Sequence, residues 1–274
     1  MTDPLHRYLA RLGLGADARP TLDTLTALHR AHALSVPYEN LDVQLQRPLS
    51  TDTGAALAKV ASGRGGWCYE MNGILGWALE EVGFEVKRLA GAVARDVAGD
   101  SVIGTHLVLL VRVDGEDWIG DVGYGDGLID PVRLREGAIS GNPLACSLQR
   151  IEGGWWRYLN DPRSGGPNFD FNPDVATEAL LDDRCDFQQR DPASPFVQNA
   201  VVQRWTGDAH YSLRGRVLRV LTVEGEEKSL IDSSADYVRR LREAFAIDLP
   251  RAAELWPAIC RRHDEVFAGR DPLV

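Results

Sequence analysis

Residues 64–83 read RGGWCYEMNGILGWALEEVG, a glycine-containing turn that leads into an amphipathic helix. From Cys68 onward, apolar residues recur at steps of three and four, which is the period of one helix face. Gly83 suits the left-handed residue that ends many helices. The sequence therefore predicts a helix from about residue 68 to residue 82, with Cys68 in its first turn.

Cys68 is the first candidate for chemistry. Amide N–H groups and the helix dipole at a helix N-terminus favour a thiolate over a thiol, and the same amides can bind an oxyanion. The alternative is a buried apolar cysteine without a chemical role. The other cysteines lack this setting and form no CxxC pair, so we predict no zinc site and no redox dithiol. We interpret them as packing residues: Cys146, Cys185 and Cys260.

After Gly83 the hydrophobic period changes from that of a helix to that of strands. The segments before this point, and the last segments of the chain, have helical periods. The order predicts a helical part, a β part and a mixed α/β part. The expected strands cover residues 84–93, 105–113, 118–122, 147–151 and 155–159, with a further apolar region at 211–223.

His106 is the second candidate, because it lies within the otherwise apolar stretch Thr105–Val111. A buried polar ring needs a partner or a function, and a core histidine bonded to backbone is the alternative. Asp114-Gly115 predicts a two-residue hairpin turn. Counting outward from that turn places Asp121 diagonally across from His106 on one face, within reach of its side chain.

This register pairs Val111 with Trp118 and Val108 with Asp121. It depends on the turn, because a slip of one residue would put His106 and Asp121 on opposite faces. A carboxylate beside the ring would orient it and stabilise an imidazolium. The rival carboxylates are interpreted as surface turn residues: Asp117, Asp126 and Asp130.

The composition limits the remaining function classes. The chain has 274 residues and a formal net charge of −10, with no basic run, which argues against nucleic acid as the main partner. No signal peptide or long apolar segment is recognisable, so we expect a cytoplasmic protein without a membrane partner. The pattern GDVGYGDG at residues 120–127 lacks the spacing of a dinucleotide-binding motif.

Several separated segments resemble one family, the arylamine N-acetyltransferases. Residues 64–73 closely resemble the family's nucleophile motif. The similarity continues through nearly the whole chain in the family's order. The other similar segments are residues 20–29 and 36–42 (N-terminal signature), 105–111 (histidine strand), 121–125 (aspartate segment), and 186–187 and 194–196 (the region after the barrel).

The resemblance implies an α+β fold in three parts with a core like that of cysteine proteases. These would be a helical bundle bearing the nucleophile (residues 1–83), a β-barrel-like domain bearing His and Asp (84–190), and an α/β lid (191–274). It also implies a catalytic triad, whose members map onto Cys68, His106 and Asp121.

The implied reaction carries an acetyl group from acetyl-CoA to an arylamine, arylhydroxylamine or arylhydrazine, through S-acetyl-cysteine and without a metal. Glu39 and Arg64 are expected to form an ion pair near the site. Tyr38 and Tyr124 occupy two pocket positions where the family more often has phenylalanine. The residues assigned to substrate binding are Tyr38, Tyr69, Gly104, Thr105, Tyr124 and Gly125.

Three other functions remain open at this point. Some relatives in the family are amide synthases that close polyketide macrolactams, taking an acyl chain from a carrier protein. A papain-like amidase would share the Cys–His–carboxylate arrangement and use water as acceptor. A binding module without catalysis is disfavoured, because all three triad members are present.

Overall fold

The computed structural model describes residues 3–15, 18–175, 178–207 and 209–273. Within them the chain is α+β. None of the helices in these ranges has both the length and the hydropathy that a membrane crossing requires. The helices are α1 (Pro4–Arg11), α2 (Leu22–Ser35), α3 (Leu41–Gln44), α4 (Thr53–Ala61), α5 (Cys68–Val82), α6 (Arg95–Ala98), α7 (Glu178–Arg190), α8 (Pro195–Gln198), α9 (Ser234–Phe245) and α10 (Trp256–Val266), with 3-10 turns at Gly99–Val102, Glu152–Gly154 and Pro250–Leu255.

The strands form two antiparallel sheets. An 8-stranded sheet has the order β5-β4-β3-β2-β9-β8-β7-β6, and a 5-stranded sheet has the order β1-β10-β11-β12-β13. The strands of the larger sheet are β2 (Glu85–Val93), β3 (Ile103–Val113), β4 (Glu116–Gly120), β5 (Val132–Arg133), β6 (Gly137–Ala138), β7 (Ser147–Arg150), β8 (Trp156–Leu159) and β9 (Phe169–Phe171). Those of the smaller sheet are β1 (Tyr38–Glu39), β10 (Val201–Thr206), β11 (Ala209–Arg214), β12 (Val217–Leu221) and β13 (Glu226–Leu230).

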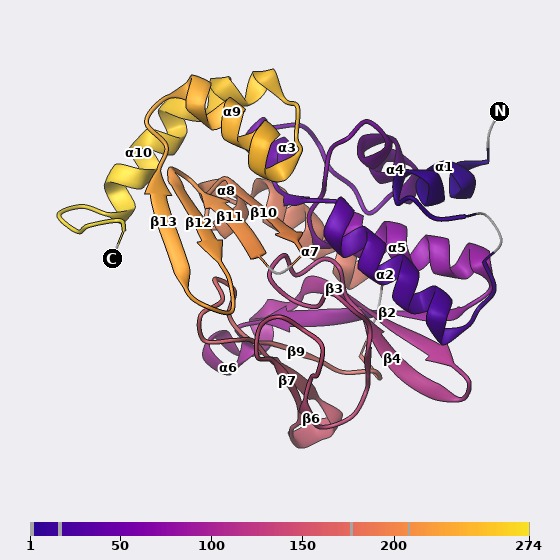
Figure 1. Ribbon diagram of the computed structural model, residues 1–274. Coiled ribbons are helices and arrows are strands. Elements are labelled where there is room, and N and C mark those ends of the chain that lie inside the picture. Colours follow the sequence, from indigo (N-terminus) through magenta and orange to yellow (C-terminus); the bar gives the residue numbers. More distant parts are fainter. Residues whose placement is uncertain (1–2, 16–17, 176–177, 208, 274) are drawn as a thin grey trace.

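Figure 1 shows the helices α1, α2, α4 and α5 together on one side, above the larger sheet, and β10–β13 with α9 and α10 on the opposite side. The short strand β1 joins these regions, because Tyr38 pairs with Gln203 and Glu39 with Val202 of β10. The first part of the chain therefore completes the sheet of the last part. The three-part division at residues 83 and 190 stays a prediction, as does the cytoplasmic location.

Helix α5 lies in the main core and begins at the predicted residue. Its N-terminus is fixed by Glu70, whose carboxylate accepts a hydrogen bond from the Trp67 amide at 3.3 Å. It ends at Gly83, which adopts the left-handed conformation with φ 103°. The apolar face of α5 packs on β2 and β3, and Ile74, Leu75 and Leu79 are fully buried. The helix expected from the sequence is confirmed.

The hairpin between β3 and β4 has the predicted register. Asp114 and Gly115 both have positive φ, 49° and 81°, which is the two-residue turn expected there. Val111 pairs with Trp118 and Leu109 with Gly120. The predicted end of the strand at residue 122 is wrong, because β4 stops at Gly120. Beyond this point the chain leaves β3 and makes its hydrogen bonds with helices α2 and α5 instead.

The C-terminal sheet differs from the single apolar region expected at residues 211–223. The structure has two strands there, β11 and β12, joined through a turn at Gly215. Strand β10 and helix α7 had no counterpart among the expected elements. The buried residues of α9 (Tyr237, Leu241 and Phe245) pack against Val202 and Leu213 of this sheet, so the smaller sheet has its own hydrophobic core.

Candidate active site

Cys68 is the first residue of α5, and only 3% of it is exposed. The turn before it is held to β1: the Gly66 amide donates to the Pro37 carbonyl at 3.2 Å, and the Glu39 amide donates to the Gly66 carbonyl at 2.9 Å. Because the amides of a helix's first turn have no partner within the helix, they point their N–H groups toward this end. Cys68 therefore occupies the electropositive end of a buried helix.

The structure brings the three predicted triad residues together. Nε2 of His106 lies 2.7 Å from Oδ2 of Asp121, and both side chains are almost completely buried. Cys68 lies close enough to His106 to contribute to the raised pKa of its imidazole. Because Asp121 takes Nε2, the ring nitrogen that faces Cys68 is Nδ1. Cysteine, imidazole and carboxylate thus form one continuous chain of contacts.

The electrostatics favour a charged imidazole. Burial alone would lower the pKa of His106, but the Asp121 carboxylate, which accepts a hydrogen bond from the ring, and the neighbouring Cys68 outweigh burial and raise the pKa to about 10. An imidazolium at neutral pH next to a sulfur at a helix N-terminus is the arrangement that supports a thiolate.

Asn72 ties the triad carboxylate to the nucleophile helix. Its Nδ2 donates to Oδ1 of Asp121 at 2.7 Å, and its Oδ1 accepts from the Val122 amide at 2.9 Å. Gly123 packs so closely here that an added Cβ would lie 2.8 Å from Cα of Cys68. Sequence reasoning did not select Asn72. A signal was available, because Asn72 stands four residues after Cys68 and so lies on the same face of α5.

Tyr38, Tyr124 and Gly125 line a narrow pocket beside Asp121, together with Met71 and Gln203. The Tyr124 ring lies 5.2 Å from the His106 ring, centre to centre. The two tyrosines differ in their hydroxyl groups. That of Tyr124 donates to the Pro167 carbonyl, whereas that of Tyr38 has no side-chain hydrogen bond within the described residues. The pocket therefore offers one available hydroxyl, that of Tyr38.

The other three residues predicted to bind substrate, Tyr69, Gly104 and Thr105, form a separate cluster with helix α7. The Tyr69 hydroxyl donates to the Gly104 carbonyl at 2.7 Å and accepts from Nε2 of Gln188 at 2.8 Å. Gln188 also donates to the Thr105 carbonyl at 2.8 Å. Gly104 and Thr105 lie where the β2–β3 register shifts. Such bulges often lie next to active sites, and the substrate role of these three residues stays a prediction.

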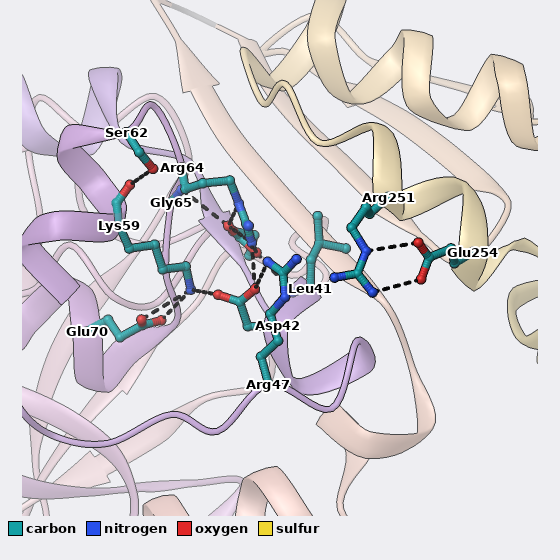
Figure 2. Close-up of polar contacts among 11 residues, drawn as sticks. Leu41, Asp42, Arg47, Lys59, Ser62, Arg64, Gly65, Glu70, Arg251 and Glu254 are labelled. Carbon is teal, nitrogen blue, oxygen red and sulfur yellow. Dashed lines mark hydrogen bonds and ion pairs between the residues drawn. The ribbon is translucent and has the colours of Figure 1, made fainter. Parts of the chain in front are cut away.

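A buried ion network supports the segment that carries Cys68 (Figure 2). Glu39, which has no exposed surface, accepts from Nε and Nη2 of Arg64 at 2.7 and 2.9 Å. Arg64 also donates to Asp42, and Lys59 bridges Asp42 and Glu70 at 2.9 Å each. The expected Glu39–Arg64 pair therefore exists, as part of a network that joins β1, α3, α4 and α5.

Glu39→Gln should lower the free energy of unfolding by about 3 kcal/mol, because it removes one of the two buried carboxylates that balance the Arg64 charge. Urea unfolding at neutral pH measures this. The matched control is Glu254→Gln, which breaks the exposed Arg251–Glu254 pair seen in Figure 2. That control should leave the unfolding midpoint unchanged, since water already solvates both groups. Equal effects of the two substitutions would contradict a supporting role for the network.

Within the described ranges, no group of three or more His, Cys, Asp or Glu side chains is arranged to hold a metal ion. The residues at the site are instead a cysteine, a histidine and an aspartate. This set is suited to acyl transfer through a covalent intermediate.

Comparisons of the sequence and of the fold with known proteins find N-acetyltransferases. A family model described as N-acetyltransferase matches residues 21–254. An arylamine N-acetyltransferase of Mycolicibacterium smegmatis is 36% identical over 271 residues, covering 91% of this chain and 94% of that protein. The solved M. smegmatis arylamine N-acetyltransferase has a TM-score of 0.84 at 35% identity, covering 95% of this chain and 98% of that one. A Mycobacterium marinum arylamine N-acetyltransferase in complex with CoA has a TM-score of 0.84 at 31% identity, with 96% and 99% covered.

Proposed function

The chain belongs to the arylamine N-acetyltransferase family, and we propose that it carries an acetyl group from acetyl-CoA to an arylamine through an S-acetyl-Cys68 intermediate. It is an acyltransferase with acetyl-CoA as cosubstrate. The observation that carries the covalent step is the contact chain from Cys68 through His106 to Asp121, with Cys68 at the start of α5.

The first half-reaction begins from a Cys68 thiolate paired with the His106 imidazolium. Sulfur attacks the thioester carbonyl of acetyl-CoA, and a bond forms between Cys68 and the acetyl carbon. The bond from that carbon to the CoA sulfur breaks. His106 gives its proton to the departing CoA thiolate, so that free CoA leaves and His106 becomes neutral.

The second half-reaction runs through the same residues in reverse roles. The amine nitrogen attacks the acetyl carbon, neutral His106 accepts the nitrogen's proton, and the Cys68 sulfur departs as a thiolate. This restores the starting ion pair. Asp121 holds the imidazole in place in both halves, and the first-turn amides of α5 are placed to stabilise the oxyanion of each tetrahedral intermediate. Ping-pong kinetics follow.

Intact-mass spectrometry tests the covalent step. The protein is mixed with acetyl-CoA without acceptor, and an aniline is then added. We expect the gain of one acetyl group, mapped to Cys68, and its loss on addition of the amine. Absence of an adduct on a Cys68 that still reacts with a thiol reagent would contradict the proposal. Acylation from a carrier protein instead would indicate an amide synthase, and discharge to water an amidase.

Because only the Tyr38 hydroxyl is available in the pocket, we expect Tyr38 and Tyr124 to respond differently to substitution by phenylalanine. Tyr38→Phe should change the ratio of kcat/KM between acceptors with and without a polar ring substituent, by up to about tenfold, because it removes the unbonded hydroxyl. Tyr124→Phe should leave this ratio unchanged, because the Tyr124 hydroxyl points to the Pro167 carbonyl. Steady-state kinetics with matched anilines measure both. Equal shifts from the two substitutions would contradict the assignment.

A further inference from the structure

We propose that His29 is a positioning residue whose imidazole holds both ends of the loop from Asp121 to Ile129, and thereby places the triad carboxylate and the acceptor pocket. This inference rests on the function proposed above. In the sequence, His29 is indistinguishable from an ordinary helix residue, since it lies in α2, far along the chain from Asp121.

The contacts of His29 assign its tautomer. Its Nε2 accepts from the backbone amide of Asp121 at 3.0 Å, and its Nδ1 lies 2.8 Å from the carbonyl oxygen of Ile129. An amide N–H only donates and a carbonyl oxygen only accepts. Nε2 must therefore carry the lone pair and Nδ1 the proton. One neutral ring with one tautomer satisfies both contacts.

The backbone amide of Asp121, the first residue of the loop, needs a hydrogen-bond acceptor. Strand β4 ends at Gly120, so the amide of Asp121 is the first one beyond the hydrogen-bond ladder with β3. Asp121 is 1% exposed, and a buried amide without a hydrogen-bond partner destabilises the fold. His29 meets this need from another element. Because the same ring binds Ile129, it also fixes the distance between the two ends of the loop.

The loop from Asp121 to Ile129 contains residues that the proposal uses in both half-reactions. Asp121, at its first end, holds His106. Tyr124 and Gly125, further along, line the narrow pocket proposed for the acceptor. Holding the first end therefore places the base, and holding the second end shapes the pocket.

The surroundings keep the ring neutral. His29 is fully buried, and burial lowers its pKa, although the Ile129 carbonyl and the nearby carboxylates Asp121 and Asp130 act in the opposite direction. Protonation would place a second N–H at Nε2, facing the Asp121 amide, and remove the acceptor. Neutrality is thus a requirement of the observed contacts.

His32 supplies a matched comparison one turn further along α2. It is equally buried, and its Nδ1 lies 2.6 Å from the Tyr8 hydroxyl. Its Nε2 has no partner within the described residues. The Tyr8 hydroxyl, which His32 contacts, belongs to neither the triad nor the loop, so substituting His32 changes core packing without affecting the contacts of His29.

Two substitutions of His29 each remove the hydrogen bond at one end of the loop and keep the other. In His29→Asn the side-chain amide lies near the position of Nδ1 and can donate to Ile129, but nothing accepts from Asp121. In His29→Gln the amide oxygen lies near the position of Nε2 and can accept from Asp121, but the bond to Ile129 is lost. Asparagine therefore releases the triad end of the loop, and glutamine releases the pocket end.

The two half-reactions are measured separately, as the rate of Cys68 acetylation by acetyl-CoA and as the KM for an arylamine. We expect His29→Asn to slow acetylation about tenfold to a hundredfold, as misplacement of a catalytic group does. His29→Gln should keep acetylation within about threefold and raise the arylamine KM several-fold, since remote positioning contributes to acceptor binding. His32→Asn should leave both quantities unchanged in the folded protein.

Residue-resolved hydrogen exchange of the backbone amide of Asp121 in the intact protein supplies a readout that does not depend on turnover. The Asp121 amide should be protected in the wild type and in His29→Gln, and should lose protection in His29→Asn. An unprotected Asp121 amide in the wild type would overturn the inference even if no variant folds. So would equal losses of both half-reactions in the two His29 variants, or variants that behave like His32→Asn. Failure of wild-type Cys68 to become acetylated would instead refute the proposed function.

Discussion

Cys68→Ala should lower the rate of arylamine acetylation by at least about 10⁴-fold, because the covalent route has no other nucleophile at the site. Only the sulfur that receives the acetyl group is removed. The main core around α5 is otherwise intact, so the variant should fold. Steady-state kcat with acetyl-CoA and an aniline measures the loss, and intact mass should show no acetyl adduct. Cys68→Ser should be nearly as inactive, since a hydroxyl is a much weaker nucleophile than a thiolate.

A second buried cysteine provides the control. Cys185 is 2% exposed in α7 and belongs to the same core as Cys68. Burial raises the pKa of its thiol to about 12, so Cys185 stays protonated and unreactive. Cys185→Ala should lower thermal stability and keep the acetyl adduct and turnover. Near-native turnover in Cys68→Ala, or loss of the adduct in Cys185→Ala alone, would exclude Cys68 as the nucleophile.

Asp121→Asn should lower kcat by about 10³- to 10⁴-fold, as in other triads that lose the charge but keep the shape of this residue. Asp121 is the main reason that the pKa of His106 is raised to about 10 against the opposing effect of burial. Without the carboxylate, only Cys68 opposes burial, so the pKa of His106 should fall well below its wild-type value. The imidazole is then neutral at pH 7, so the thiolate loses its counter-ion and the departing CoA loses its proton donor. Alkylation of Cys68 at pH 7 should slow in parallel with kcat.

The same shift has a consequence for stability. The folded-state pKa of His106 lies above its ordinary value of 6.5, so protonation of His106 favours the folded state. That contribution is fully present below pH 6.5 and is lost as the pH rises toward 10. Wild-type unfolding free energy should therefore fall across this window more steeply than that of Asp121→Asn. Urea titrations at pH 6 and pH 9.5 compare the two.

Asp117→Asn is the matched control for the carboxylate. Asp117 lies in β4, the strand that leads into Asp121, and its carboxylate pairs with Arg112 at the surface. Its substitution should leave kcat, the alkylation rate and the pH dependence of stability unchanged. Equal losses in Asp117→Asn and Asp121→Asn would show that the effect arises from the strand rather than from the carboxylate beside His106.

Sequence reasoning selected three residues that the structure brings together, because local patterns decide their positions. The period of residues 68–82 predicts a helix that starts at Cys68, and the observed α5 has these bounds. The two-residue turn at Asp114-Gly115 determines which residues of β3 and β4 face each other, and the observed register follows that count. The strand end was misplaced because hydrophobic alternation continues through Val122, whereas the ladder stops at Gly120.

Other parts of the site had no local signal. Nothing near residue 203 indicates that β10 pairs with Tyr38, and nothing near Tyr124 indicates that its hydroxyl points to Pro167. The residues predicted to bind substrate lie in two places, the narrow pocket and the cluster with α7. The second cluster depends on Gln188, which lies in a helix that was not among the expected elements.

The sequence by itself predicted Cys68, His106 and Asp121 as the candidate triad, together with the helix and hairpin that carry them, because periods and a tight turn act over a few neighbouring residues. Only the tertiary structure decided how these parts are held. His29 reaches Asp121 across 92 residues of sequence and Ile129 across 100, and Asn72 reaches Val122 across 50. Such bonds follow from which polar groups are left without partners when the elements pack, and this is known only once the whole chain is folded.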